Sequence, residues 1–371
     1  MYSIKFYPIH SLVNKKNNEL KEKFIPYEKQ IVRKSSHRKI RPVKYRREKK
    51  ILNRKQGLPY LVKEKLVIEI NVIGYKTEGE SSVVFIKYDS GIAFSIVVDC
   101  FCCRNMNKTV EILRNNNIKH IDYLCWSHPD NDHSKGMCDI YDEFVNENTI
   151  VNIPENVDSA YKKCSNKVKN LFDKLKTESC NSKSNIYTVS DSKDLLFYKN
   201  DICFEYDDYD IDLKMNSFAP NSSLIRKKSL YGDFNKNEHS IGFTIKLGEV
   251  VLMFTGDMGN TTIAKLPKLS EQLYFLKIPH HGSETSSKML DVFKSVNVVC
   301  STVYRKGSNN LPSQNIINSY KKKTNNLYIT SSDTNNPNDN GYGVINISID
   351  VLNDSFQTTL YGDAISVDCS K

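Results

Sequence analysis

The stretch Ile121–His133, with the sequence IDYLCWSHPDNDH, decides how the rest of the chain is interpreted. Its first six residues are mostly apolar and predict a short buried strand. The next seven place four candidate metal ligands within six positions: His128, Asp130, Asp132 and His133. A tight loop at a strand end points several short side chains at one spot, as metal binding requires. Without a metal, so many charged or imidazole groups would repel one another or lose hydration.

Two later segments repeat this arrangement of an apolar strand followed by ligand-type residues. The run VVLMF at 250–254 is followed by Thr255-Gly256-Asp257, and the strand predicted at Leu273–Ile278 is followed by Pro279-His280-His281-Gly282-Ser283. Adjacent histidines point in different directions, so one can bind metal while the other contacts substrate or a supporting group. The sequence leaves open which of the two histidines is the ligand.

Apolar patterns over the rest of the chain predict two mixed halves of strands and helices, which favours two packed sheets with helices outside. Strands are expected at 66–72, 83–88, 92–99, 121–126, 186–189, 195–198, 202–206, 213–218, 241–247, 250–254, 273–278, 296–300, 327–330, 344–349 and 357–361. Helices are expected at 108–116, 134–146, 157–175, 286–293 and 313–322. A connection is expected at 74–82, and the polar stretch 221–240 is interpreted as a long functional loop.

Taken together, the motifs resemble the metallo-β-lactamase-fold hydrolases, in particular a stand-alone form of their ComEC-type (competence hydrolase-like) branch. The family signature H-x-H-x-D-H appears at 128–133 with Asp130 at the second histidine position, and TGD, PHHGS and the block NEHSI at 237–241 also match. The resemblance runs from about Leu66 to the C-terminus. It implies an α/β fold, a four-layer αββα sandwich. The chain departs from the branch after Asp99, where Cys100-Phe101-Cys102 replaces the usual Cys-Gly.

The resemblance also implies roles for individual residues. The implied metal ligands are His128, Asp130, Asp132, His133, His239, Asp257 and His281. His128, Asp130 and His239 would serve one ion; Asp132, His133 and His281 (or His280) would serve the other, with Asp257 bridging. Asp132 would also orient the attacking water, and His280 would stabilise charge or protonate the leaving group. The expected cofactor is one or two divalent transition-metal ions, Zn²⁺ or Mn²⁺. His239 fits an ordinary loop histidine equally well, and Asp130 in place of histidine fits a centre with one tightly held ion.

Positive charge is concentrated at the N-terminus. Residues 1–60 contain 18 Lys and Arg against 4 Asp and Glu, whereas the remainder contains 35 against 39. Such a run predicts an arm that binds nucleic acid or another acidic surface, although a solvated extension has the same composition. The candidate nucleic-acid-binding residues are Arg33, Lys34, Arg38, Lys39, Arg41, Lys44, Arg46, Arg47, Lys49 and Lys50. We therefore divide the chain into a basic extension, 1–60, and a hydrolase-like domain, 61–371.

The function predicted from these features is a metal-dependent phosphodiesterase, most concretely a nuclease acting through a metal-activated water. The alternatives are a metallo-hydrolase of a small cyclic nucleotide or other phospho- or carboxylic ester, and a non-catalytic sensor of the same fold. No apolar run reaches the about 20 residues of a membrane span, and Lys5 interrupts any signal-peptide core, so we expect a cytoplasmic protein with no membrane partner. Cys100, Cys102 and Cys103 lack a second ligand pair for a zinc–thiolate site, and packed free thiols are the simpler interpretation.

Overall fold

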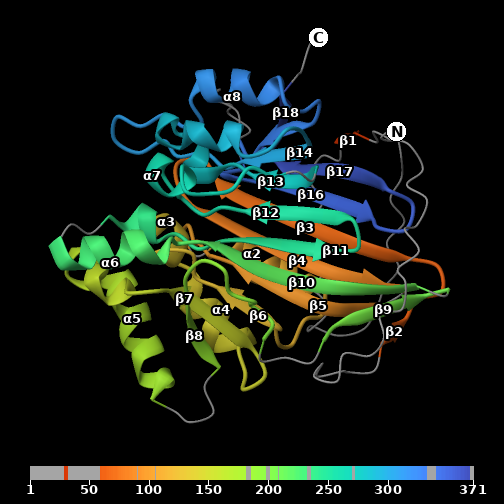
Figure 1. Ribbon diagram of the computed structural model, residues 1–371, viewed down its shortest axis with the longest axis horizontal. Helices are drawn as coiled ribbons and strands as arrows, with labels where there is room; N and C mark the ends of the chain where they lie inside the picture. The colour runs from red at the N-terminus through yellow and green to blue at the C-terminus, as the bar shows by residue number, and fades with distance from the viewer. Residues whose placement is uncertain are drawn as a thin grey trace, which may run out of the picture.

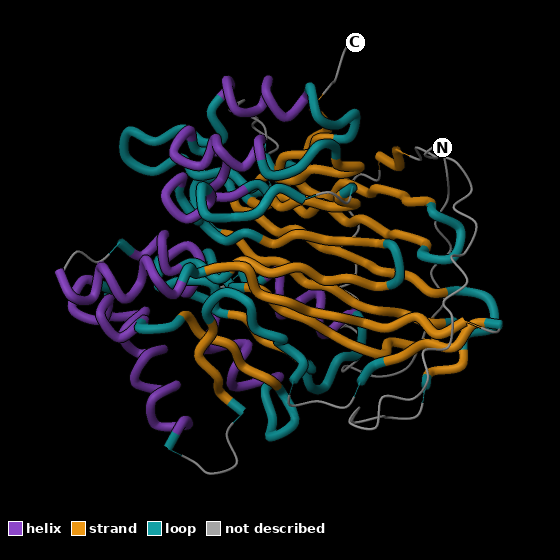
Figure 2. Tube along the Cα trace, viewed as in Figure 1, coloured by secondary structure: helices purple, strands orange, loops and turns teal. Residues whose placement is uncertain are grey.

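Apolar runs of the sequence become two β-sheets that pack face to face (Figures 1 and 2). The computed structural model describes residues 29–31, 59–89, 91–104, 106–180, 185–197, 201–207, 209–231, 235–269, 272–331 and 340–367. Within these residues each sheet has nine strands. In the first sheet the order is β1 (Lys29–Ile31), β17 (Ser355–Gly362), β16 (Tyr342–Asp350), β3 (Leu66–Tyr75), β4 (Glu80–Tyr88), β5 (Gly91–Val98), β6 (Tyr123–Cys125), β7 (Ile150–Pro154) and β8 (Ile186–Val189).

The second sheet has a similar plan. Its order is β18 (Ile365–Val367), β15 (Leu327–Ile329), β14 (Val296–Ser301), β13 (Leu273–Lys277), β12 (Val250–Phe254), β11 (Gly242–Leu247), β10 (Tyr209–Ala219), β9 (Cys203–Tyr206) and β2 (Tyr60–Leu61). Each sheet joins an antiparallel part to a parallel part: β5 to β8 are parallel in the first sheet, and β12 to β15 are parallel in the second. Parallel neighbours need crossover connections, and these connections carry most of the helices.

Helices cover the outer face of each sheet, so the predicted four-layer αββα sandwich is confirmed. The helical segments are α2 (Lys108–Asn115), α3 (Asn131–Ser134), α4 (Met137–Phe144), η1 (Val157–Lys163), α5 (Asn166–Ser179), α6 (Ser222–Tyr231), η2 (Lys236–His239), α7 (Asn260–Ile263), η3 (Pro279–Gly282), η4 (Glu284–Asp291) and α8 (Gln314–Lys321). Residues such as Ile70 of β3 and Phe243 of β11 form the core between the sheets. Leu171 of α5 packs on the outer face of the first sheet, and Tyr320 of α8 packs on that of the second.

Several predicted boundaries are wrong, each for a local reason. The connection expected at 74–82 shrinks to 76–79, because β3 continues to Tyr75 and β4 begins at Glu80. The helix expected at 134–146 is interrupted before α4 at Gly136, where a Cβ would lie 2.6 Å from the Cys100 sulfur and 2.9 Å from the Phe101 carbonyl carbon. The Gly136 amide donates to the Cys100 carbonyl at 2.9 Å instead of to a carbonyl of the helix, a contact that sequence periodicity does not report.

The helix expected at 157–175 is also two segments, η1 and α5. Ser165 between them has the extended conformation of a residue that precedes a helix, and its hydroxyl lies 2.5 Å from the Asn131 side-chain oxygen. The strand expected at 195–198 is wrong: the Leu196 amide donates to the Asp194 carboxylate, which closes a turn, and Tyr198 lies outside the described residues. The helix expected at 286–293 is the 3₁₀ segment η4, and the loop expected at 221–240 contains α6 and η2.

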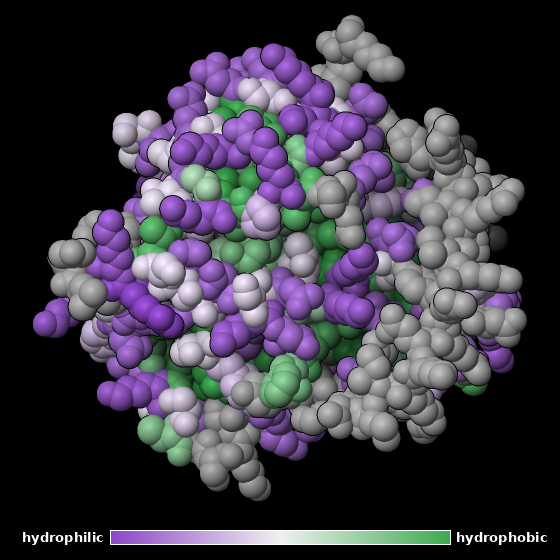
Figure 3. Space-filling model, in the orientation of Figure 1, coloured by the Kyte–Doolittle hydropathy of each residue, from purple (hydrophilic) through white to green (hydrophobic). Residues whose placement is uncertain are grey.

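The surface drawn in Figure 3 is mainly hydrophilic over the described residues of that face. None of the helices that the structure describes is both long and apolar enough to cross a membrane. The cysteines described are free thiols, Cys100 is fully buried, and the metal-ligand group found within the described ranges does not include Cys102 or Cys103. The packed-thiol interpretation therefore accounts for Cys100 better than a zinc–thiolate site does.

Candidate metal centre

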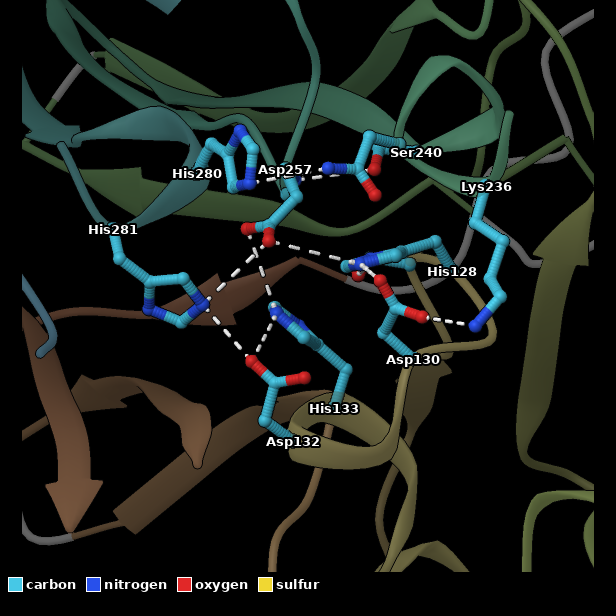
Figure 4. A network of polar contacts seen from close by, with 12 residues as sticks. His128, Asp130, Asp132, His133, Lys236, Ser240, Asp257, His280 and His281 are labelled. Atoms are coloured by element: carbon cyan, nitrogen blue, oxygen red, sulfur yellow. Dashed lines mark hydrogen bonds and ion pairs between the residues drawn. The ribbon is translucent and has the colours of Figure 1, made fainter. Parts of the chain in front are cut away.

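The motif residues meet at the carboxyl ends of parallel strands from both sheets. The segment 127–133 follows β6, Asp257 follows β12 and the two histidines follow β13. In Figure 4 the side chains of His128, His133, Asp257 and His281 point toward one another across the gap between these loops. Ligand sites form at such strand ends because several loops open toward the same place.

Two of the histidines are held by Asp99, a buried carboxylate at the end of β5. The Ser127 hydroxyl donates to Asp99 Oδ2 at 2.5 Å, and His133 Nδ1 lies 2.7 Å from the same oxygen. His128 Nδ1 lies 3.0 Å from the Ser127 oxygen, which must accept because its proton is already donated. Both rings therefore carry a proton on Nδ1, so Nε2 is the nitrogen of each ring that would bind a metal ion.

The third histidine, His281, is fixed in the same way by a different chain of groups. Its Nδ1 lies 2.8 Å from Thr302 Oγ1, and Thr302 donates to Glu80 Oε2 at 2.5 Å. The buried ammonium of Lys277 donates to the same Glu80 oxygen at 2.7 Å. Glu80 therefore ends a relay that directs Nε2 of His281 into the centre, a common arrangement behind metal-binding histidines.

Three distances inside the centre are long for hydrogen bonds and close to those between ligands of one ion. His133 Nε2 lies 3.5 Å from Asp132 Oδ2 and 3.5 Å from Asp257 Oδ1, and His281 Nε2 lies 3.5 Å from Asp257 Oδ2. Ligand atoms about 2.1 Å from a tetrahedral ion lie roughly 3.4 Å apart. The contact between His281 Nε2 and Asp132 Oδ2 is shorter, at 3.0 Å.

Three buried atoms in this group have no hydrogen-bond partner among the described residues: His128 Nε2, His133 Nε2 and Asp257 Oδ1. Buried polar atoms are almost always paired, and a bound ion is one physical reason for an exception. The side chains of Glu80, His133, Asp257 and His281 place one ligand atom each within 4.8 Å of the others. The nitrogen and carboxylate donors suit a divalent transition metal, so the residues fit the predicted cofactor.

The electrostatics favour a cation as well. Burial lowers the pKa of His133, but the surrounding carboxylates, Asp257 foremost, raise it well above its ordinary value. Burial raises the pKa of Asp257, yet His281 and His133 bring it well below its ordinary value. Four buried carboxylates lie in or directly behind the centre: Glu80, Asp99, Asp132 and Asp257. Such an excess of buried negative charge is stabilised by protons or by a metal ion.

Asp130 has different surroundings from the other carboxylates. Its Oδ2 lies 3.5 Å from His128 Nε2, while its Oδ1 accepts from the ammonium of Lys236 at 2.5 Å. Burial raises the pKa of Asp130, but His128 and Lys236 bring it well below its ordinary value. Asp130 is therefore an ionised carboxylate that is already shared with a protein cation.

The structure separates the roles of the two adjacent histidines. His281 points into the centre, whereas His280 has partners on both ring nitrogens: Thr285 Oγ1 at 2.9 Å from Nδ1 and Asn237 Nδ2 at 3.2 Å from Nε2. Both residues have left-handed backbones, with φ of 51° and 50°. Such strain concentrates at functional sites. The geometry thus favours His281 over His280 as the ligand.

His239 is buried, and its Nδ1 donates to the Glu155 carbonyl oxygen at 3.1 Å. This bond fixes the proton on Nδ1 in His239 too, as in the three histidines of the centre. Its assignment as a ligand of the first ion stays a prediction.

Several residues of the centre lie outside the sequence motifs, among them Glu80, Lys277 and Asp99. Glu80 opens β4 behind Gly79, and Lys277 ends an otherwise apolar strand. A charged residue at the end of a buried strand was the available signal, and Asp99 shows the same signal. The nucleic-acid-binding candidates, from Arg33 to Lys50, lie outside the described residues.

No protein-family model and no curated protein match this sequence. Among solved structures, a protein of Parabacteroides distasonis assigned as a metal-dependent hydrolase is 14% identical, with 69% of this chain and 96% of that chain covered, at a TM-score of 0.38. A diphosphatase of the PhnP family is 12% identical, and the match covers 82% of this chain and 100% of that chain at a TM-score of 0.37. A mutant metallo-β-lactamase of Cronobacter sakazakii is 9% identical, and the match covers 53% of this chain and 70% of that chain at a TM-score of 0.30. Likeness at this level carries no conclusion about activity or family, so the ComEC-type resemblance stays a prediction from the motifs.

Proposed function

We propose that this chain is a metal-dependent hydrolase with a metallo-β-lactamase-like centre, and that it cleaves phosphodiester bonds in nucleic acid. One observation carries the hydrolase part of the proposal. Within the part of the chain that the structure describes, the Nε2 atoms of His128 and His133 are buried without hydrogen-bond partners. His133 Nε2 lies 3.5 Å from one oxygen of each of two carboxylates, as two ligands of one ion would.

The residues divide the work between holding the ion and supporting the reaction. His133, His281, Asp132 and Asp257 would hold a divalent ion, and His128 with Asp130 lies next to it. When bound, such an ion supplies a Lewis acid and lowers the pKa of a coordinated water. Asp132 orients the attacking oxygen through its second carboxylate oxygen. His280 is the candidate contact for the leaving group, and burial lowers its pKa, so the ring is neutral at pH 7.

Nucleic acid is proposed as the substrate because of charge. The N-terminal 60 residues carry 18 Lys and Arg against 4 Asp and Glu, which suits a polyanion. A fold does not fix a substrate, so this part depends on a direct measurement.

The experiment compares wild-type protein with Asp257→Asn, which keeps the shape of the side chain but weakens it as a ligand. Purified samples are analysed for bound metal and then incubated with bis-p-nitrophenyl phosphate, single- and double-stranded DNA, and RNA, with and without EDTA. We expect wild-type turnover that EDTA abolishes, and a loss of at least about 100-fold in Asp257→Asn, the scale of removing one strong catalytic interaction. Asp291→Asn, an exposed carboxylate on η4, is the matched control.

The outcomes separate the two parts of the proposal. Turnover of the small diester without cleavage of any polynucleotide would contradict the nucleic-acid part and favour a small-substrate hydrolase. Wild-type activity in Asp257→Asn, or activity that EDTA does not change, would contradict the metal-dependent mechanism.

A further inference from the structure

The candidate centre has two unequal halves. In the half around His133, Asp132 and Asp257 both face imidazole nitrogens, and no lysine contact to either carboxylate is found in the part of the chain that the structure describes. In the half around His128, the nearest carboxylates are Asp130, at 3.5 Å, and Asp257, at 3.8 Å. Of Asp130, Asp132 and Asp257, only Asp130 has an ammonium partner among the described residues. Its second oxygen, Oδ1, lies 2.5 Å from Nζ of Lys236.

Lys236 is placed in the site by the short segment η2. Asn235 precedes this segment, and its side-chain oxygen accepts from the Asn237 amide at 3.1 Å. Lys236 and His239 are three residues apart in a 3₁₀ turn, so their side chains leave the same face. The Glu155 carbonyl anchors His239 at 3.1 Å, and Lys236 reaches Asp130 in Figure 4. One turn of chain therefore supplies a protein cation to the His128 half and carries His239, the ligand that the family resemblance assigns to that half.

We propose that Lys236 is a built-in substitute for the second metal ion, so that the centre binds one ion tightly in the His133 half and a second ion only weakly. This inference rests on the proposed metal centre. An ammonium on Asp130 neutralises the carboxylate that a second ion would use, and it repels a dication in the same half. The ammonium also keeps positive charge beside the reaction site without a second metal.

The test is a count of bound ions, which does not depend on activity. Metal-free full-length protein is titrated with Zn²⁺ alone, and separately with Mn²⁺ alone, against a chromophoric chelator. Retained metal is then measured after gel filtration. For wild-type protein we expect one retained ion per chain and a second ion that binds at least about 10- to 100-fold more weakly, the range typical of supporting-residue effects on metal affinity.

The variant Lys236→Met removes the ammonium but keeps the length of the side chain. We expect it to strengthen the second binding step by about 10- to 100-fold and to leave the first unchanged. Lys135→Met is the matched control: Lys135 is exposed to a similar extent, 22% against 25%, and its ammonium pairs at 2.9 Å with Glu78, outside the centre. Lys236→Gln serves as a second variant in case Lys236→Met does not fold.

Each outcome of the titrations either agrees with the inference about Lys236 or contradicts it. Two ions of similar affinity in wild-type protein, or an unchanged second step in both Lys236 variants, would overturn the inference. One bound ion without turnover of bis-p-nitrophenyl phosphate would contradict the proposed function but agree with the inference. No bound ion in any sample would overturn both.

Discussion

At the residue scale, Asp99 organises the centre although it is not one of the proposed metal ligands. Its two oxygens accept from the Ser127 amide at 2.7 Å and from the Ser127 hydroxyl at 2.5 Å, and His133 Nδ1 lies 2.7 Å away. A carboxylate accepts all of these bonds. The side-chain amide of an asparagine at this position would point its NH₂ group, a donor, at one of the groups that donate to Asp99.

We therefore expect Asp99→Asn to weaken metal binding by about 10- to 100-fold, because the proton position of His133 is no longer fixed. The measurement is the same chelator titration, with thermal unfolding recorded in parallel. Asp122→Asn is the control, since Asp122 accepts from the Ser95 amide at 3.0 Å and hydroxyl at 2.9 Å in the same pattern but outside the centre. If both variants lose stability equally and neither loses metal affinity, the role of Asp99 is purely structural.

The candidate ligands could largely be predicted from the sequence, because HPDNDH, TGD and PHHGS are short and each follows an apolar strand. The supporting residues could not. Glu80 and Thr302 are 222 positions apart in the chain, and only the packing of two sheets brings them within 2.5 Å. The choice of His281 over His280 likewise depends on a backbone conformation that adjacent identical residues do not reveal.

At the scale of elements, β3 and β16 approach the end of β15 very closely. Gly74 and Gly343 are directly paired across these two strands, and a Cβ on either would collide with Thr330. At Gly343 the obstacle is backbone, since the added carbon would lie 1.8 Å from the Thr330 carbonyl oxygen.

Gly343→Ala should therefore destabilise the protein by about 3 kcal/mol or more, at the upper end of the cost of overpacking, because a backbone atom has to move. Chemical unfolding measures the change. Gly259→Ala is the control, since its nearest neighbour would be 3.8 Å away. An unchanged unfolding midpoint in Gly343→Ala would show that the strands separate without cost.

Most strands could be predicted because apolar runs report burial directly, as in β12 and β13. The helix interruptions at Gly136 and Ser165 could not, because their causes lie in contacts with Cys100 and Asn131, on separate elements. The interpretation of 221–240 as a loop failed because α6 has a weak apolar periodicity.

At the scale of the whole molecule, the centre depends on how the two sheets are positioned relative to each other. Lys277 of β13 donates to Glu80 of β4 at 2.7 Å, and both side chains are almost fully buried. This bond joins the second sheet to the first at the point where the loops of the centre meet. Sequence patterns predicted two sheets but contained no signal for their relative position.

Among the residues of 1–60 that the structure describes, 29–31 and Tyr60 pair with strands of the two sheets. Lys29–Ile31 pairs with 358–360 of β17, and Tyr60–Leu61 pairs with β9. Deleting residues 1–60 would therefore remove β1 and Tyr60 of β2 together with the basic residues. Replacing charge within 33–50 leaves both pairings in place and tests the proposed nucleic-acid contact by itself.

The variant replaces the ten Lys and Arg of 33–50 by Gln, and DNA binding is measured by fluorescence anisotropy over a range of salt. If these residues neutralise about six phosphates, log K for the wild type falls with log salt at a slope of roughly −4 on single strands and −5 on duplex, and the variant has a clearly flatter slope. Turnover of bis-p-nitrophenyl phosphate should not change, because the candidate ligands all lie beyond residue 120. Replacing the exposed lysines 162, 163, 167 and 176 is the control. An undiminished slope in the 33–50 variant, or an equal loss in the control, would place the nucleic-acid contact elsewhere and favour a small substrate.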